Sequence, residues 1–435
     1  MIVLIRKRAA RAELVFFLMF VLATAVIAGS LHSSEGWFDG RPFPAVNALP
    51  EQDDLPDPFL GPGGKRVQTL TQWQQQREYL KAMLAHYMYG HMPPAPKPDQ
   101  VTVRQTLSRK AFDGSAYEEH YTLIITRNGR SVDFGIALFR PADARRYPTI
   151  IKNCRVLFDH NAASAKTKPT VERDLQAARE SVQRGYVLCK FRREDLAPDR
   201  KSNRDEGVFP LYPDYDWGTI AVWAWAYQVV LDVLNELGYA NMSQIVCTGH
   251  SRGGQTAIAA GIFDERIDVV VPCTGGYGSC ATLRIRDPEG VRGRMDYIDH
   301  LKRSAAHWFS ERYLEFAGQQ NRLPFDAHTL VALVAPRPLL NTNATEDEYN
   351  NTLSIEAGIR TGRIVYDWMQ LGNRCRLHWR PGKHGQMKED WWALLDFADE
   401  VFFGRKGNSK FNKWVYPELT PSLPWEVPKS IGRGN

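Results

Sequence analysis

Short, continuous apolar runs alternate with longer one-sided patterns through the second half of the chain. The one-sided patterns at residues 217–238 and 355–372, for example, are each long enough for a helix of several turns. A continuous apolar run is what a strand covered on both faces requires. Such runs begin at residues 147, 185, 244, 267, 337 and 375: YPTIIKN, GYVLCKF, QIVCTG, IDVVVPC, RPLLNTN and CRLHW. Strands that alternate with helices predict an α/β protein with a doubly wound, mostly parallel sheet and helices on both faces.

The first half of the chain has a different pattern. Residues 71–89 predict a helix, with Thr71 as its N-cap and Gly90 at its end, because the apolar residues from Trp73 onward recur on one side. Polar and apolar residues alternate in HYTLIITR and VDFGIALF, between residues 100 and 140. That alternation predicts an antiparallel hairpin at one edge of the sheet.

The first 30 residues differ in composition from the rest. The uncharged run LVFFLMFVLATAVIAG, residues 14–29, follows four basic residues, Arg6, Lys7, Arg8 and Arg11. This order is typical of a secretory signal peptide, with cleavage expected near Ala28, and an uncleaved membrane anchor is the alternative. We therefore expect a secreted or periplasmic protein, anchored if the segment is retained.

These patterns divide the chain into four parts. Residues 1–30 are the signal peptide or anchor, and residues 31–99 are an N-terminal arm and helix packed on the core. Residues 100–405 are the α/β domain that carries the candidate chemistry, and residues 406–435 are a Pro-rich, polar tail. We expect the tail to wrap the surface or to stay loose.

Charge and cysteine content exclude several classes of protein. The 435 residues include 55 Lys and Arg against 49 Asp and Glu, with both signs interleaved, which argues against a nucleic-acid-binding protein. The six cysteines form no CxxC pair and have no zinc-finger spacing to histidines. The sequence as a whole implies no metal or organic cofactor. Export permits one or two disulfides without requiring them. The oligomeric state is left open.

The stretch IVCTGHSRGGQTAIAAG, residues 245–261, contains the candidate nucleophile Ser251. A buried strand is followed by a sharp turn, and a helix is expected to begin at Arg252. Gly249 and Gly253 lie two residues before and after the serine, where side chains would collide in such a turn. The helix N-terminus places partial positive charge near the serine oxygen, which can stabilise an oxyanion. Together with the sheet, this nucleophile elbow predicts the α/β-hydrolase fold.

His384 is the candidate general base. In this fold the chain order is serine, acid, histidine, and the histidine lies on the loop between the last strand and the final helix. The loop PGKHGQ at residues 381–386 fits that place. His378 lies inside the strand, and His250, beside the serine, is expected to shape the elbow or line the site.

The acid that orients the histidine is expected after the strand RPLLNTN. Three consecutive carboxylates follow it, at Glu346, Asp347 and Glu348. We select Asp347, with Glu346 as the first alternative and Glu348 as the second, because the acid must approach the imidazole Nδ1 closely.

Several longer motifs carry a resemblance to a known family. They include LPDPF at residues 55–59, DWGTIAVWAWA at 216–226, GHSRGGQTA at 249–257 and LPFDAHTLVALVAPRPLL at 323–340. The sequence resembles the glucuronoyl esterase family of carbohydrate esterases over most of the chain after the N-terminal segment. The resemblance implies a serine esterase that cleaves the ester between glucuronic acid side groups of xylan and lignin alcohols. Its partner would be a carbohydrate ester such as glucuronoxylan.

The resemblance also assigns roles to single residues. Ser251 matches the family nucleophile, His384 its base, and Arg252 the arginine that helps to hold the oxyanion. Trp308 is similar in context to a tryptophan near the bound sugar. A further oxyanion donor is expected from the loop near Cys154 and Arg155.

Two positions depart from the family pattern. Gln255 stands where much of the family has a lysine that contacts the uronic acid, so a charge-assisted contact becomes a neutral one. Thr274 stands where many members have a catalytic glutamate, which leaves the Asp347 loop as the source of the acid. Two alternatives therefore stay open: an acetylxylan or other small-ester esterase, and a non-catalytic carbohydrate-binding relative.

Overall fold

The computed structural model of the chain describes residues 42–158, 168–285 and 297–431. Its centre is one nine-stranded sheet with the order β1-β2-β3-β5-β4-β6-β7-β8-β9. Neighbouring strands from β5 to β9 are parallel, and β1, β2 and β3 are antiparallel. The strands are β1 Val101–Ala111, β2 Ala116–Arg127, β3 Arg130–Pro141, β4 Tyr147–Cys154, β5 Val187–Arg192, β6 Ala240–His250, β7 Val269–Cys273, β8 Leu339–Ala344 and β9 Cys375–Arg380. All six apolar runs are strands, which confirms the predicted doubly wound sheet.

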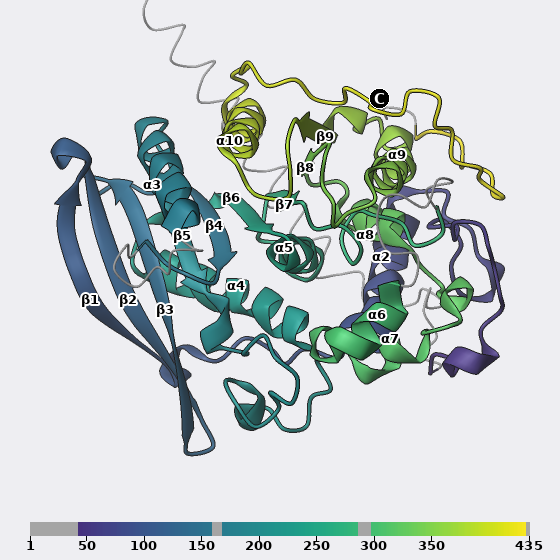
Figure 1. Ribbon diagram of the computed structural model, residues 1–435, viewed down its shortest axis with the longest axis horizontal. Helices are drawn as coiled ribbons and strands as arrows, with labels where there is room; N and C mark the ends of the chain where they lie inside the picture. The colour runs from purple at the N-terminus through teal and green to yellow at the C-terminus, as the bar shows by residue number, and fades with distance from the viewer. Residues whose placement is uncertain (1–41, 159–167, 286–296, 432–435) are drawn as a thin grey trace, which may run out of the picture.

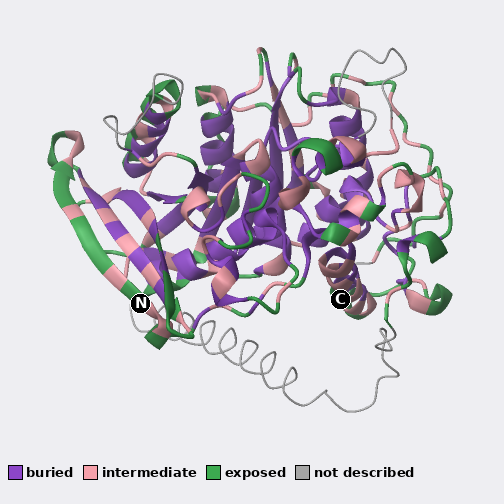
Figure 2. Cartoon of the chain, turned by 60° about the horizontal axis from the view of Figure 1, so that its bottom comes forward, coloured by how far each residue is buried: buried purple, intermediate pink, exposed green. Residues whose placement is uncertain are grey.

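The antiparallel edge is larger than the predicted hairpin. β2 and β3 pair along their whole length around the turn at Asn128 and Gly129, both at positive φ (51° and 71°), as a tight hairpin turn requires. β1 then pairs with β2, so β1 and not the hairpin forms the edge of the sheet. Figure 2 shows β1 as largely exposed, whereas the centre of the sheet is buried.

Helices cover both faces of the sheet (Figure 1). α3 and α10 share one apolar core with Val246 of β6, and α4, α5, α8 and α9 share the other with Ile245 and Cys247 of the same strand. Adjacent residues of β6 thus point into opposite cores, which explains why the run carries no polar alternation. The helices are α2 Leu70–Leu84, α3 Lys168–Gln183, α4 Thr219–Glu236, α5 Arg252–Phe263, α6 Tyr297–Ser304, α7 Glu311–Glu315, α8 Ala327–Val334, α9 Thr352–Trp368 and α10 Lys388–Phe403.

The N-cap of α2 is Thr69, so the prediction of Thr71 was wrong. Thr69 Oγ1 accepts from Gln72 N at 3.2 Å, and Gln72 Oε1 accepts from Thr69 N at 3.1 Å, which is a capping box. TLTQ and TQWQ both match this motif, so the pattern alone did not distinguish the two starts. The helix continues as a π-turn and ends, as predicted, at Gly90, whose φ of 77° and close approach to Asp216 O exclude a side chain.

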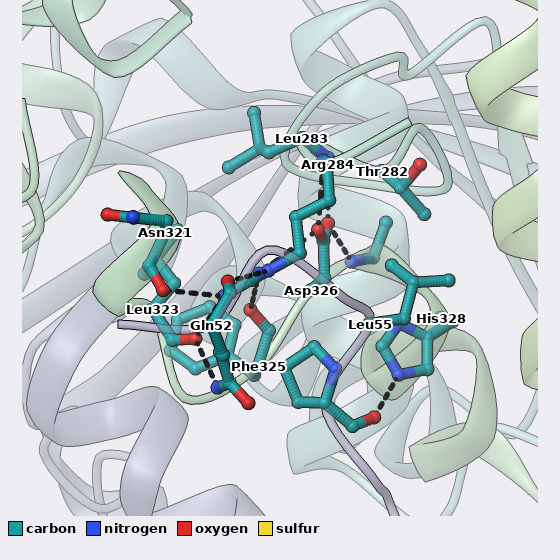
Figure 3. A network of polar contacts seen from close by, with 12 residues as sticks. Gln52, Leu55, Thr282, Leu283, Arg284, Asn321, Leu323, Phe325, Asp326 and His328 are labelled. Atoms are coloured by element: carbon teal, nitrogen blue, oxygen red, sulfur yellow. Dashed lines mark hydrogen bonds and ion pairs between the residues drawn. The ribbon is translucent and has the colours of Figure 1, made fainter. Parts of the chain in front are cut away.

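The N-terminal arm is bound to the core beside a buried ion pair between Arg284 and Asp326 (Figure 3). Arg284 Nε donates to Gln52 O at 3.1 Å and Nη2 to Leu323 O at 2.7 Å, and His328 Nε2 lies 2.7 Å from Pro56 O. The guanidinium therefore joins the arm to the loop before α8.

The C-terminal segment runs over the surface and contacts the arm. Trp425 Nε1 donates to Leu55 O at 2.9 Å, and Asn412 N donates to Leu377 O at 2.8 Å. Up to Ile431, the tail wraps the surface, which is the first of the two predicted outcomes.

Across residues 42–158, 168–285 and 297–431, none of the helices combines the length and the apolar character that crossing a membrane requires. The predicted signal peptide or anchor at residues 1–30 lies outside the described residues.

Candidate active site

Ser251 forms the turn between β6 and α5. Its backbone has φ 59° and ψ −124°, a conformation that non-glycine residues rarely adopt. A Cβ on Gly249 would lie 2.3 Å from Gly253 O, and a Cβ on Gly253 would lie 2.6 Å from Asn153 Oδ1. The expected steric reason for both glycines is confirmed. The strain holds the serine side chain at the head of α5, beside N–H groups of the first turn that lack intrahelical acceptors.

Asn153, at the end of β4, holds the elbow from behind. Its Nδ2 donates to Gly253 O at 2.9 Å and to Tyr227 Oη at 2.8 Å, and its Oδ1 accepts from Arg193 Nη1 at 2.9 Å. The guanidinium of Arg193 lies over the Trp223 ring, and its burial lowers the pKa of Arg193 to about 10. Arg193 therefore stays charged at neutral pH. Neither residue can be recognised from the sequence, because their hydrogen-bond partners lie 40 to 100 positions away along the chain.

The three consecutive carboxylates after β8 each contact a different residue of the loop after β9. Glu346 Oε1 accepts from Gly382 N at 3.2 Å, and Glu348 Oε1 pairs with Lys383 Nζ at 2.7 Å. Asp347 Oδ2 lies 2.8 Å from His384 Nδ1. Three contacts thus join the two adjacent loops, and Asp347 is the carboxylate that contacts the imidazole.

Asp347 has the environment of an ionised carboxylate. Its side chain is 0% exposed and also accepts from Tyr349 N at 2.9 Å and Asn350 Nδ2 at 2.8 Å. Burial raises the pKa of Asp347, but the hydrogen bond with His384 and the backbone and amide donors outweigh burial, so the net pKa lies below its usual value. An ionised Asp347 fixes the proton of His384 on Nδ1 and leaves Nε2 as the free base.

The loop that carries His384 is anchored by the buried side chain of Arg380. Arg380 Nη1 donates to Pro381 O and Nη2 to Lys383 O, both at 3.0 Å, and Nη2 also donates to Gly385 O. Its Nε pairs with the buried carboxylate of Asp390 at 2.6 Å. One guanidinium therefore holds carbonyls on both sides of His384.

Two aromatic rings lie close to the His384 imidazole. The ring centroid of His250 lies 4.6 Å away, and that of Tyr349 lies 5.1 Å away. Burial and the nearby His384, Lys152, Arg193 and Arg380 keep the pKa of His250 well below its usual value, so it stays neutral. Among the described residues, no hydrogen bond joins the Ser251 hydroxyl to His384. Such contacts are often long before substrate binds.

Arg252 forms an ion pair with Asp199, a residue that the sequence alone does not single out. Asp199 Oδ1 also lies 2.8 Å from Trp308 Nε1 and 3.0 Å from His307 Nε2, and the Arg252 guanidinium lies 5.1 Å from the centre of the Trp308 ring. Burial raises the pKa of Asp199, but the His307 hydrogen bond and the Arg252 charge lower it far below its usual value. Asp199 thus joins the elbow to the segment that carries Trp308.

Gln255 faces protein backbone one turn into α5. Its Nε2 donates to Tyr277 O at 2.7 Å and to Gly275 O at 3.2 Å, and Oε1 is buried without a hydrogen-bond partner among the described residues. Thr274 is buried and lies at φ 44°, and its carbonyl accepts from Asn350 Nδ2 at 3.2 Å. In this arrangement the amide nitrogen of Gln255 holds the loop that follows Thr274.

The described residues of the site include neither a disulfide nor a group of metal ligands. All six cysteines are buried free thiols, and Cys154 Sγ donates to Phe191 O. Arg155, in the same loop, pairs with Glu194 at 2.6 Å. In the described parts of the chain, no three His, Cys, Asp or Glu side chains group as a metal site would require.

A strained serine elbow after a central parallel strand, with a paired histidine and aspartate on the loops after β9 and β8, is the arrangement of an α/β-hydrolase. A family profile described as "Glucuronyl esterase, fungi" matches residues 124–370, more than half of the chain. The chain belongs to the glucuronoyl esterase family, and the protein is a carboxylic ester hydrolase.

Related proteins support this assignment. The chain is 25% identical over 398 residues to "Carbohydrate esterase MZ0003" from an unknown prokaryote, covering 80% of this chain and 90% of that protein. It is 28% identical to "4-O-methyl-glucuronoyl methylesterase 1" of Wolfiporia cocos, covering 75% and 77%. The solved structure of a family 15 glucuronoyl esterase from Caldicellulosiruptor kristjansonii has a TM-score of 0.70 at 27% identity, covering 88% and 99%. A glucuronoyl esterase from Solibacter usitatus, at 24% identity, shares the fold with a TM-score of 0.71, covering 82% and 99%.

Proposed function

We propose that Ser251, His384 and Asp347 hydrolyse esters of glucuronic acid through an acyl-enzyme. His384 Nε2 removes the proton from Ser251 Oγ, and Oγ bonds to the ester carbonyl carbon. When the tetrahedral intermediate collapses, the bond to the alcohol oxygen breaks and Nε2 gives its proton to that oxygen. Water, activated by the same imidazole, then releases the acid and regenerates Ser251. Asp347 orients His384 and stabilises its charged form.

The observation that carries this proposal is the 2.8 Å contact between Asp347 Oδ2 and His384 Nδ1, on loops beside the elbow of Ser251. A surface histidine would not need a fully buried carboxylate with three hydrogen-bond donors. The catalytically silent alternative has no use for this pair, so the arrangement favours an enzyme with an intact site.

The oxyanion and the sugar bind on the side of Ser251 that carries Arg252 and Trp308, away from the Asp347 loop. The Arg252 backbone N–H, at the first residue of α5, is aimed at the developing oxyanion, and its side chain supports that charge. Asp199 holds Arg252 and Trp308 together, which supports a place for the sugar beside the Trp308 ring. Gln255 supports the site indirectly, because its amide fixes the loop after Thr274. His250 lines the site beside His384 as an uncharged side chain.

The proposed substrate is a glucuronic acid ester on xylan, with a lignin alcohol as the leaving group. Family membership and the curated relatives named glucuronoyl methylesterases support the acid part. A cell-wall polymer is too large to enter a cell, so we also infer that the enzyme acts outside the cytoplasm. The basic and then apolar order of residues 1–30 supports that location.

The proposal is tested by comparing the wild type with Ser251→Ala on benzyl glucuronate, methyl glucuronate and acetylated xylan. We expect the wild type to cleave both glucuronate esters and the Ser251→Ala variant to keep only a small residual rate on each. Release of acetate alone, with both glucuronate esters intact, would contradict the glucuronoyl assignment and favour an acetylxylan esterase.

A further inference from the structure

The C-terminal tail covers the outer edge of β9. This strand ends the sheet order, so among the described residues no further strand pairs with it there. Asn412 N donates to Leu377 O at 2.8 Å, and Leu377 N donates to Asn412 Oδ1 at 2.9 Å. His378 Nδ1 lies 3.1 Å from Lys410 O. The tail thus protects an exposed sheet edge, and it does so on the strand that leads into the loop of His384.

The next part of the tail is bound to α9 by Glu356 and Arg360, which lie one turn apart (Figure 1). The side chain of Glu356 is fully buried and accepts from Val415 N at 2.8 Å and Tyr416 N at 3.2 Å. Arg360 pairs with Glu356 at 2.7 Å and donates to Tyr416 O and Leu419 O, both at 2.8 Å. A buried carboxylate is costly unless it is hydrogen-bonded, so these contacts fix the backbone of the tail on the helix.

Tyr416 extends from this fixed backbone to the first turn of α9. Its Oη lies 2.6 Å from Oγ1 of Thr352, the buried first residue of the helix. Asn351, the preceding residue, is the N-cap of α9. Asn350 comes directly before it and donates from Nδ2 to Asp347 Oδ2 at 2.8 Å. Two side-chain contacts and three consecutive residues therefore join the tail to the catalytic acid.

We propose that Tyr416 is a positioning residue for Asp347, so that the docked tail holds the acid against His384. This inference rests on the proposed function and adds a residue to its machinery. The tail contacts β9 before the His384 loop and α9 after the Asp347 loop, and so connects the supports of both residues. A shift of the first turn of α9 would move Asn350 away from Asp347. The acid must stay close to Nδ1 to hold the productive tautomer of the imidazole.

The test measures kcat, KM and melting temperature for Tyr416→Phe, Thr352→Val and the double variant on benzyl and methyl glucuronate. Each single variant keeps the shape of its side chain and removes one hydroxyl. Loss of one hydrogen bond predicts a decrease in kcat of about two- to tenfold on both esters, with KM within about twofold of the wild type. Because the two hydroxyls contact each other, the double variant should be no slower than the slower single variant.

Tyr147→Phe is the matched control. It removes a tyrosine hydroxyl that binds Asp143 at the start of β4, at the opposite end of the parallel strands from the site. Its kcat should equal that of the wild type. Wild-type kcat in Tyr416→Phe overturns the proposal even if the melting temperature falls, because the contact would then be structural only. Multiplication of the two single effects in the double variant also overturns it.

The wild type separates this proposal from the proposed function. If it cleaves neither glucuronate ester, the proposed function is overturned together with the role of Tyr416. If it cleaves them, the variants test the tail alone.

Discussion

Asp347 Oδ2 lies 2.8 Å from His384 Nδ1, and this contact separates Asp347 from the two carboxylates beside it. Glu346 and Glu348 bind Gly382 and Lys383 instead. The pairing depends on an alignment of two loops that are joined to adjacent parallel strands, β8 and β9. Three similar side chains therefore have three different tasks, and variants can tell them apart.

Asp347→Asn should reduce kcat on benzyl glucuronate by about 10³- to 10⁴-fold, because an amide would stabilise the wrong tautomer of His384. Glu348→Gln is the matched control: it removes an exposed ion pair with Lys383 and should stay within about threefold of the wild type. If the two variants lose activity equally, Asp347 does not orient the base.

The pH dependence of activity in the mildly acidic range should contain no contribution from protonation of Asp347. Because the pKa of Asp347 is lowered in the folded protein, this carboxylate stays ionised throughout the mildly acidic range. The stability that it contributes is present above about pH 3.9, its ordinary value, and is lost as the pH falls through the lower folded value. We therefore expect protonation of Asp347 to lower kcat/KM on benzyl glucuronate only as the pH falls below about 3.9, and a pH–rate profile measures this. A loss of kcat/KM between about pH 4 and pH 6 that disappears in Asp347→Asn would contradict a carboxylate that stays ionised there.

Arg380 should act as a positioning residue for His384. Arg380→Lys retains the charge beside Asp390 but cannot reach the carbonyls of Pro381, Lys383 and Gly385 together. A loop displaced by about 1 Å costs on the order of 10²-fold in rate, so kcat should fall by about that factor while KM changes little. If Arg380→Lys has the kcat and the melting temperature of the wild type, the loop keeps its position without the guanidinium.

Asp390→Asn tests the other half of this pair through stability. It leaves the guanidinium of Arg380 buried without a countercharge, which should lower the free energy of unfolding by about 3–5 kcal/mol. Chemical denaturation measures this loss. Asp232→Asn removes an exposed carboxylate paired with Arg266 and should cost less than about 1 kcal/mol.

Asp199→Asn should weaken the acyl side of the site. Arg252 would lose its ion pair while the amide could still accept from Trp308, so the loss reports mainly the position of the guanidinium. A charge-assisted contact contributes about 1.5–3 kcal/mol, which predicts a decrease in kcat/KM of about 10- to 100-fold on both glucuronate esters. Wild-type kcat/KM in this variant would mean that Arg252 needs no fixed orientation.

The sequence predicted those features that depend on neighbouring residues. Apolar runs, the Gly249 and Gly253 positions and the start of α5 are local signals, and each was confirmed. Asn153, Arg193 and Asp199 were missed because their roles depend on partners brought together by the sheet. Thr69 was missed for a different reason, since two overlapping capping motifs fit the same helix start.

The most direct test of the central claim is the kcat/KM of the double variant Ser251→Ala/Asp347→Asn on benzyl glucuronate. Residues that act as one unit lose their effect together, so removal of the nucleophile makes the acid irrelevant. We predict that the double variant is no less active than Ser251→Ala alone. A further loss of 10³-fold or more in the double variant, multiplying the two single effects, would contradict a common catalytic unit of Ser251, His384 and Asp347.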